Sequence, residues 1–561
     1  MVKVYREKKL SPSEVRRKAR KETFERVIGV ISIRTLIKYL IFTIFAVNLF
    51  RALRIRYFSQ TGDAAGYVDV LSNTSDPGSL NFAYGTGVLA IHKMVVLGSD
   101  FKCPTSIPAG TDTNFFYYHA YLIGFVFRYF AALFPDPTIP TLGLLSASVS
   151  FGLFAIYNFF RTKKVALPVC AAFILLVLTS PLFYQGLSWN PYINRLFFGP
   201  SIYVVLSLMR EDKIARSKLL KISIAAILCI SLSERSSLYI GIAILLCLIL
   251  RGRSRFKLDF SHCVLAVISV TGIIWYIVWT YLISSNRDYS SGSFSNLLAN
   301  FNSAVMGARL NSFMVLITAL VPFILLATAS FRLFFAAIIL LIPIIVVNDS
   351  TGNLDSYYAH YQSDFFPIFL AFAAVGLSNI NLMKIRSAAF SAWIAVSLLA
   401  SLAYINDQRP ELPLKDSLQI STNEVSNSLG LYYLPNNSEL ARNYLQSKKM
   451  VNDTFRTIGA FISTKDSRVS APEELMPSLI SNDNRSIDYF PIGVGTSQFV
   501  LAPYLATNPE IPDVSIYGSV PLELRPLWSN CIQGVLKSKY DLVKEWQTGS
   551  GRISLYKLID P

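Results

Sequence analysis

The sequence has little that would suit a metal centre or a secreted soluble protein. The 561 residues include only four histidines and six cysteines, and the cysteines lack the spacing of a zinc site. The basic N-terminal segment has no small-residue cleavage site after a short apolar core, so it does not resemble a secretory signal peptide. Internal repeats and low-complexity blocks are also missing. Long apolar runs are therefore the dominant feature of the chain.

These apolar runs indicate an α-helical polytopic membrane protein. Hydrophobic residues make up 52% of the chain and the mean hydropathy is +0.43, whereas soluble domains reach about 45 to 50% only with glycine counted. Runs of about 17 to 25 mostly apolar residues are candidate transmembrane helices. Such runs occupy 35–52, 141–160, 165–184, 195–210, 218–233, 236–250, 262–285, 311–329, 331–349, 362–379 and 387–404.

Charge orients these eleven predicted spans. Much of the net charge of +17 lies in the N-terminal arm, residues 1–34, and in short loops between apolar runs. This is the positive-inside pattern of a membrane protein, and we expect no nucleic-acid partner. The apolar segment 115–134 contains His119 and Arg128. If it crossed the membrane, nearly all the basic loops would move outside, so a re-entrant or interfacial helix is expected there.

The resulting topology puts the N-terminus in the cytosol and the polar segments on the extracytoplasmic side of a cytoplasmic (inner) membrane. The transmembrane domain would span 35–404, with a first outer loop at 53–114. Other outer segments include "SWNPYINR" (188–195) and "NDSTGNLDSYYAHYQSD" (348–364). The basic loops thus lie on the cytosolic side of the membrane, and the candidate functional residues lie on the other side.

The sequence of residues 405–561 predicts a separate extracytoplasmic α/β domain. Its composition is that of a soluble protein, with the β-like runs "RVSAP", "SIDYF", "QFVLAP", "DLVKEW" and "RISLYKL" and helical stretches such as "PLWSNCIQGVL". Cys103 and Cys531 are the cysteines that would face outward. A disulfide between them is one alternative, and two free thiols are the other.

Asp63 is the first candidate for catalysis. It lies just beyond the first span, in "TGDAAGYVDVLSN", where the alternative is an ordinary solvated carboxylate. Glu234 and Arg235 lie in a tight outer turn, "SER", at the membrane boundary. A charge near mid-membrane costs about 2.5 to 3.5 kcal/mol, so charges near a span end need partners or a function. The alternative is that these two side chains pair and cap the turn.

Histidines accompany these acidic segments. His360 and Asp364 are four residues apart, so both can face one side of a helix that begins near 362. Tyr361 lies beside them, and His119 follows two tyrosines in "NFFYYHAYL". An aromatic belt at the membrane interface is the alternative for both clusters. A bound divalent metal ion is a further alternative, and its ligands are unknown.

Two classes of function fit an outward cavity at the membrane surface. One is a transferase that takes a sugar from a lipid phosphate, and the other is a transporter or flippase of lipid-linked sugars. Transport predicts functional charges at mid-membrane and two related halves with broken spans. The predicted span interiors carry almost no charge and the halves show no symmetry, which favours chemistry at the surface.

The order of these features resembles the C-type (GT-C fold) glycosyltransferase superfamily, whose members are integral membrane enzymes that use polyprenyl-phosphate sugars, and a related family of bacterial polytopic membrane proteins. His360 and Tyr361, followed after five residues by Pro367, are similar to that family's His-Tyr pattern with its downstream Pro. The stretch "RVSAPEELMPSLISNDNRSIDYFP" (468–491) looks like the family's segment after the last span.

The resemblance implies an inverting transfer of a sugar from a polyprenyl-phosphate donor to a glycan, lipid or protein acceptor. By this analogy Asp63 would be the base that takes the proton of the acceptor hydroxyl. Arg235 or Arg195 would hold the donor phosphate, since a guanidinium binds phosphate oxygens in a bidentate way. The remaining candidates for the donor site are Glu234, His119, His360, Tyr361, Asp364, Trp189 and Asn190.

Overall fold

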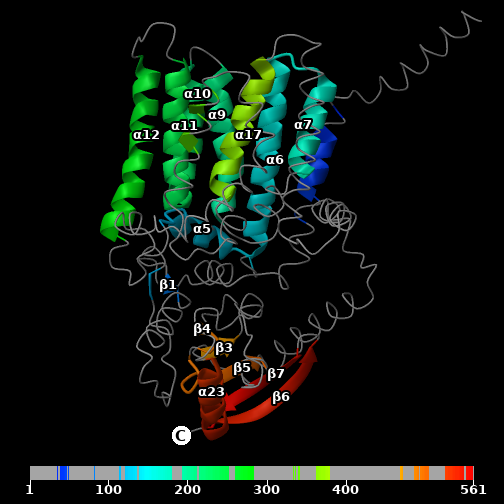
Figure 1. Cartoon of the computed structure of the whole chain (residues 1–561), viewed down its shortest axis with the longest axis vertical. Helices are drawn as coiled ribbons and strands as arrows, with labels where there is room; N and C mark the ends of the chain where they lie inside the picture. The colour runs from blue at the N-terminus through cyan, green and yellow to red at the C-terminus, as the bar shows by residue number, and fades with distance from the viewer. Residues whose placement is uncertain are drawn as a thin grey trace, which may run out of the picture.

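The computed structural model describes a helical bundle, a short β-ribbon and a C-terminal sheet (Figure 1). The residues described are 35, 38–46, 49, 81–82, 113–114, 120–134, 138–179, 193–210, 214–251, 259–283, 333, 335–336, 339–340, 362–379, 468–471, 486–491, 493–503, 525–548 and 551–559. The predicted spans 311–329 and 387–404, and most of 331–349, lie outside them.

The bundle helices coincide with the predicted apolar runs. They are α6 (Thr138–Thr162), α7 (Leu167–Thr179), α9 (Phe198–Arg210), α10 (Arg216–Leu232), α11 (Glu234–Arg251), α12 (Phe260–Val278) and α17 (Gln362–Asn379). A 3-10 helix, η3 (Ile193–Phe197), leads into α9, and a π-helical turn, η4 (Trp279–Ile283), extends α12. The helix positions agree with the sequence, while the total of eleven spans stays a prediction.

Two of these helices are long and apolar enough to cross a membrane, Ile139–Thr162 and Phe260–Val278. A core helix of a soluble protein can pass the same test, but it would be buried. Only 22% of the apolar window of α12 is buried. Its outward aliphatic side chains share one helix face, and they are Val267, Val270, Ile274 and Ile277. A contiguous apolar face of this kind marks a surface that contacts lipid or protein rather than water.

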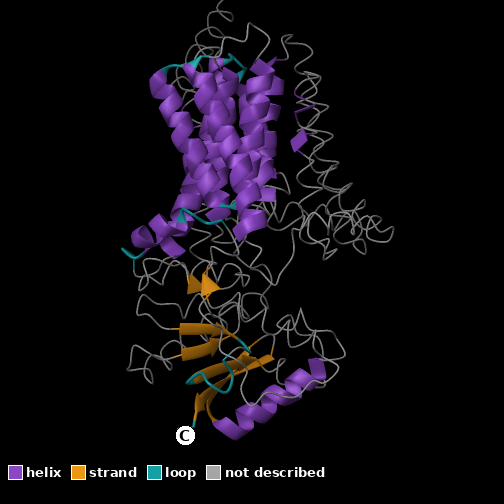
Figure 2. Cartoon of the chain, turned by 90° about the vertical axis from the view of Figure 1, so that its left-hand side faces the viewer, coloured by secondary structure: helices purple, strands orange, loops and turns teal. Residues whose placement is uncertain are grey.

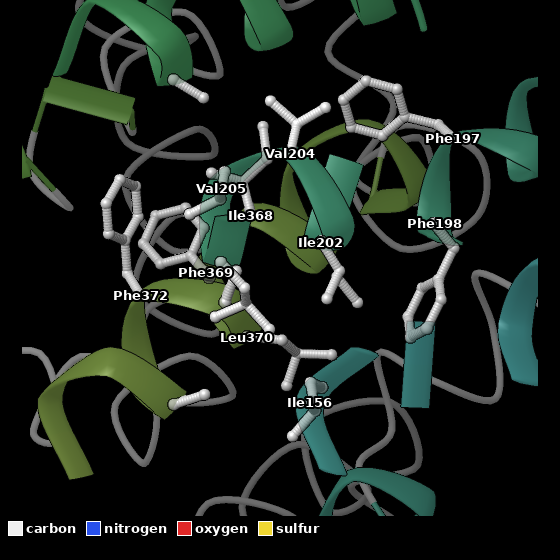
Figure 3. Close-up of a cluster of buried hydrophobic side chains, with 14 of the residues drawn as sticks. Ile156, Phe197, Phe198, Ile202, Val204, Val205, Ile368, Phe369, Leu370 and Phe372 are labelled. Carbon is white, nitrogen blue, oxygen red and sulfur yellow. The ribbon is translucent and has the colours of Figure 1, made fainter. Parts of the chain in front are cut away.

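Helix α9 lies at the centre of the bundle and is buried along nearly its whole length. Helices α6 and α17 pack against it. Figure 3 shows the resulting cluster, which includes Phe198 and Ile202 of α9, Ile156 of α6 and Phe369 of α17. A helix that is apolar on all sides is stable only when neighbouring helices surround it, so α9 organises the bundle.

Helices α11 and α12 approach each other closely at two glycines. A Cβ atom on Gly241 would lie 2.8 Å from the carbonyl oxygen of Ser269, and one on Gly272 would lie 2.7 Å from that of Ser237. The Ser269 hydroxyl donates a hydrogen bond of 2.6 Å to the carbonyl oxygen of Gly241. Small residues and serine hydroxyls are typical of helix interfaces within membranes.

Helix α5 (Gly124–Ala131) lies across one end of the bundle (Figures 1 and 2). At 1.5 Å per residue its eight residues span about 12 Å, too little to cross a hydrocarbon core of about 30 Å. This length agrees with the expectation that 115–134 does not cross. The antiparallel ribbon of β1 (Asn81–Phe82) and β2 (Thr113–Asn114) lies between this end of the bundle and the C-terminal sheet.

The C-terminal sheet is mixed, with the strand order β4-β3-β5-β7-β6. Strand β3 is parallel to β4 and β5, and β7 is antiparallel to both β5 and β6. The strands and the helix that precedes β6 coincide with the predicted runs: β3 (Arg468–Ala471), β4 (Ser486–Tyr489), β5 (Phe499–Pro503), α23 (Arg525–Lys539), β6 (Tyr540–Thr548) and β7 (Gly551–Leu558). The predicted domain boundary at 405 lies outside the described residues.

Tyr540 fixes the connection between β4 and β5. Its hydroxyl accepts a hydrogen bond of 2.8 Å from the amide of Gly495 and donates one of 2.9 Å to the carbonyl oxygen of Ser497. Gly493 and Gly495 have φ angles of 77° and 97°, values that glycine adopts without steric cost. Burial raises the pKa of Tyr540 to about 12.

Candidate functional site

The two ends of the bundle differ in charge. Exposed cations gather at the end opposite α5, and they are Arg161, Lys163, Lys164, Arg210, Arg216 and Lys221. At the α5 end the charged side chains of the described residues are buried or partly buried instead. Among the described residues, the charged side chains that are buried are Arg128, Arg195 and Glu234. A buried charge needs partners or a ligand, so this end is the candidate functional site.

Glu234 lies at the break between α10 and α11. Ser233 is extended, with φ −166° and ψ 167°, and its hydroxyl accepts a hydrogen bond of 3.0 Å from the amide of Ser236. This N-cap starts α11 at Glu234, where the carboxylate also benefits from the positive end of the helix dipole. The side chain is 5% exposed. The turn therefore directs a carboxylate into the protein.

The carboxylate of Glu234 holds the segment that leads into α5. The amide of Ala120 donates a hydrogen bond of 3.1 Å to Oε2 of Glu234. Three residues later, the amide of Ile123 donates one of 3.0 Å to the carbonyl oxygen of Ser231. The start of α5 is thus attached twice to the α10–α11 turn. Pairing of Glu234 with Arg235 was one alternative from the sequence and stays a prediction, while the bond to Ala120 gives Glu234 a partner 114 residues away in the chain.

Arg195 lies on η3 and is 3% exposed. The junction between η3 and α9 is held by Ser148 of α6, whose hydroxyl donates a hydrogen bond of 2.8 Å to the carbonyl oxygen of Leu196 and accepts one of 2.9 Å from the amide of Gly199. A Cβ atom on Gly199 would collide with the carbonyl oxygen of Ser148. This close approach of α6 and α9 sets the position of η3, and so of the backbone that carries Arg195.

Arg128 lies on α5 and is fully buried. Its guanidinium carbon is 5.1 Å from the ring centroid of Tyr129 and 5.8 Å from that of Phe125, within the range of a cation–π interaction. Its Nη2 also donates a hydrogen bond of 3.4 Å to the Tyr129 hydroxyl. Helix α5 packs against α6, so Arg128 adds a second buried guanidinium to this end of the bundle.

The start of α17 belongs to the same region. Helix η3 packs against both α10 and α17. The ring of Phe365, in the first turn of α17, is 6.0 Å from that of Tyr239, near the start of α11. The first turn of α17, which includes Asp364, therefore lies beside the first half of α11, although the side chain of Asp364 lies outside the described residues.

Arg195 and Glu234 lie at similar depth in the bundle. From a rise of about 1.5 Å per residue in an α-helix and about 2.0 Å in a 3-10 helix, Glu234 is about 25 Å along α11 from Arg251, and Arg195 is about 24 Å along η3 and α9 from Arg210. These lengths approach the thickness of a hydrocarbon core, about 30 Å. If Arg251 and Arg210 mark one membrane boundary, both buried charges lie near the other.

The structure brings together only part of the predicted site. Arg195, Glu234 and the partly buried Arg235 belong to neighbouring elements at one end of the bundle. The other candidates lie outside the described residues, and they are Asp63, His119, Trp189, Asn190, His360 and Tyr361. Arg128 was not assigned a role from the sequence. The sequence could have indicated a role for Arg128, because a charged residue is unusual within an apolar run such as 115–134.

The metal alternative stays untested. Among the described residues, no group of three or more His, Cys, Asp or Glu side chains could hold a metal ion. The histidines on which that alternative rests, His119 and His360, lie outside this part of the chain. Cys531 is disulfide-bonded, whereas the four described cysteines of the bundle are free. Cys103, the remaining cysteine of the sequence, lies outside the described residues.

No protein-family model and no curated protein matches the chain. Among solved structures it is similar to the arabinofuranosyltransferase AftD from Mycobacteria. The two chains are 12% identical at a TM-score of 0.41, over 89% of this chain and 40% of AftD. The chain thus spans less than half the length of that protein. A similarity at this level establishes neither a family nor an activity.

Proposed function

We propose that the protein is an integral membrane glycosyltransferase that transfers a sugar from a polyprenyl-phosphate donor to an acceptor on the extracytoplasmic face. The membrane location is supported by the outward apolar faces of the bundle. Helix α12 exposes four aliphatic side chains, and α10 exposes Leu220, Ile224 and Ile227 with helical spacing. In water this surface would favour association, whereas in a bilayer it lies against acyl chains.

The orientation follows from the charge of the two bundle ends. The exposed lysines and arginines lie opposite α5, and the cytosolic ends of membrane proteins carry such an excess. The α5 end then faces the extracytoplasmic side. The ribbon of β1 and β2 and the C-terminal sheet lie beyond the same end of the bundle (Figure 1), which supports an extracytoplasmic C-terminal region.

The observation that carries the proposal is the pair of buried guanidiniums, Arg128 and Arg195, at this outer end. A phosphate group on an embedded lipid lies at the same depth, where the hydrocarbon meets the headgroups. Guanidinium groups bind phosphate oxygens by charge-assisted hydrogen bonds. Arg235, which is partly buried in the first turn of α11, supplies a third cation. The site is therefore suited to a lipid phosphate.

In the proposed reaction, Asp63 takes the proton of the acceptor hydroxyl as its oxygen bonds to the anomeric carbon of the donor. The bond between that carbon and the phosphate oxygen breaks with inversion, and the electron pair leaves with the polyprenyl phosphate. Arg195 and Arg128 stabilise the negative charge that develops on the leaving oxygen. A positioned base of this kind is worth about 10² to 10⁴ in rate.

The other candidates have supporting roles. Glu234 holds the start of the described segment 120–134 through its bond to Ala120, and we assign the preceding His119 to the donor site. Asp364, in the first turn of α17, lies on a helix whose start packs beside the first half of α11. We assign His360, Tyr361, Trp189 and Asn190 to the donor-binding surface.

The test uses the full chain in lipid nanodiscs with a panel of radiolabelled polyprenyl-phosphate sugars. The wild type should release polyprenyl phosphate from at least one donor, and Asp63→Asn should lower that rate by about 10²-fold or more. Asp69→Asn, in the same loop, is the matched control and should retain activity. No turnover with any donor, together with movement of labelled lipid across vesicles containing the protein, would replace this proposal with a flippase.

A further inference from the structure

Helix α5 has the polarity of a helix in contact with lipid. Its buried face carries Gly124, Phe127, Arg128 and Ala131. Its opposite face exposes large apolar side chains. Val126 is 69% exposed, and Leu133, in the turn that follows the helix, is 77% exposed. Tyr129 and Phe130 lie between them and are also exposed. A surface helix in water places its arginines outward and its apolar residues inward. Helix α5 does the reverse.

We propose that the exposed face of α5 lies in the outer leaflet and contacts the acyl chains of bilayer lipids. This inference rests on the membrane location in the proposed function. Helix α5 lies across the end of the bundle (Figure 2), and in-plane helices bury an apolar face about 5 to 10 Å into the boundary between headgroups and acyl chains. The outward faces of α10 and α12 have the same aliphatic character.

This placement gives α5 a function in lipid access. One side of the helix contacts the bilayer, and the other holds the fully buried Arg128. A helix with its side chains is about 10 to 12 Å across. A lipid phosphate in the outer leaflet would therefore lie within one helix diameter of a buried guanidinium. Helix α5 separates the bilayer from the buried charges, and a lipid donor would enter along its edge.

The test places spin labels on the full chain in nanodiscs, in a Cys263→Ser background that removes the one free cysteine that is exposed among the described residues. Val126→Cys and Leu133→Cys report on α5. Ile274→Cys, on the outward face of α12, is the lipid reference. Thr496→Cys, exposed beside the C-terminal sheet, is the water reference. Collisions with oxygen report contact with lipid, and collisions with a water-soluble nickel chelate report contact with water.

We expect both α5 labels to match Ile274→Cys, with high access to oxygen and low access to the chelate. Labels that match Thr496→Cys would place α5 in water and overturn the inference. Labels reached by neither reagent would show that protein covers this face, through the C-terminal region or a second copy, and would overturn it too. If Ile274→Cys itself is reached by the chelate, the membrane location fails, and with it the proposed function.

Discussion

The carboxylate of Glu234 accepts a hydrogen bond of 3.1 Å from the amide of Ala120, 114 residues earlier in the chain. This bond joins the α10–α11 turn to the segment that leads into α5. Both groups are buried, so neither can exchange its partner for water. The bond makes Glu234 a positioning residue for the end of the bundle that carries α5.

Glu234→Ala should therefore destabilise the bundle by about 1 to 3 kcal/mol, because the buried amide of Ala120 loses its acceptor. Glu234→Gln keeps an oxygen acceptor and should cost less. Thermal unfolding in nanodiscs measures both, and hydrogen exchange of residues 120–131 shows whether the loss is local. Equal effects of the two substitutions would mean that charge, rather than the bond to Ala120, determines the role of this side chain.

Ser148→Ala should loosen the junction that carries Arg195. It removes the acceptor for the amide of Gly199 and the donor to Leu196, at a cost of about 1 to 3 kcal/mol. The control is Ser201→Ala, a buried serine whose hydroxyl bonds Phe198 in its own helix. Hydrogen exchange across 193–200 should rise in the first variant and stay near the wild-type level in the second. The same rise in both variants would show that the two hydrogen bonds of Ser148 do not hold this junction.

Gly241→Ala should separate α11 from α12. The added methyl group would meet the carbonyl oxygen of Ser269 at 2.8 Å, and overpacking of this kind costs about 1 to 3 kcal/mol. Gly143→Ala is the matched control, since nothing lies within 4 Å of its added carbon, and alanine favours a helix by about 1 kcal/mol. The unfolding temperature should fall for the first variant only. A fall for both would point to a general sensitivity of the helices to added volume.

Tyr540→Phe should destabilise the C-terminal sheet by about 1 to 3 kcal/mol, since the amide of Gly495 loses its acceptor. The pKa of Tyr540 is raised by burial from 10.0 to about 12. The neutral hydroxyl is therefore favoured in the folded state. Its contribution to stability is complete below pH 10 and is lost as pH rises toward 12. Hydrogen exchange of β5 to β7 should show this loss of stability in the wild type. The same loss between pH 10 and pH 12 in Tyr540→Phe would mean that another group causes it.

The sequence predicted the helical elements well because their signal is local. Apolar runs fixed α6, α10, α11 and α12 to within a few residues, and the β-like runs near the C-terminus matched the strands. The expectation that 115–134 does not cross came from the basic loops rather than from its own residues. The eight residues of α5 agree with it, while the membrane topology stays a prediction.

The partners of the buried charges could not be predicted because they depend on packing. The bond from Ala120 to Glu234 joins segments 114 residues apart, whereas the sequence could offer only the neighbouring Arg235 as one possible partner. Arg128 is an isolated charged residue in an apolar run of the sequence. Whether its side chain is buried depends on which face of α5 packs against α6. The role of Ser148 requires the contact of α6 with Gly199, which composition does not specify.

The most direct measurement is the affinity of polyprenyl phosphate for the full chain in nanodiscs, comparing wild type with Arg195→Gln. The control is Arg161→Gln, an exposed arginine at the opposite end of the bundle. Hydrogen bonds to charged groups contribute about 1.5 to 3 kcal/mol, so Arg195→Gln should weaken binding by about tenfold or more, while Arg161→Gln should leave it unchanged. Equal affinity of all three proteins, with the fold intact, would contradict a lipid-phosphate site at the outer end of the bundle.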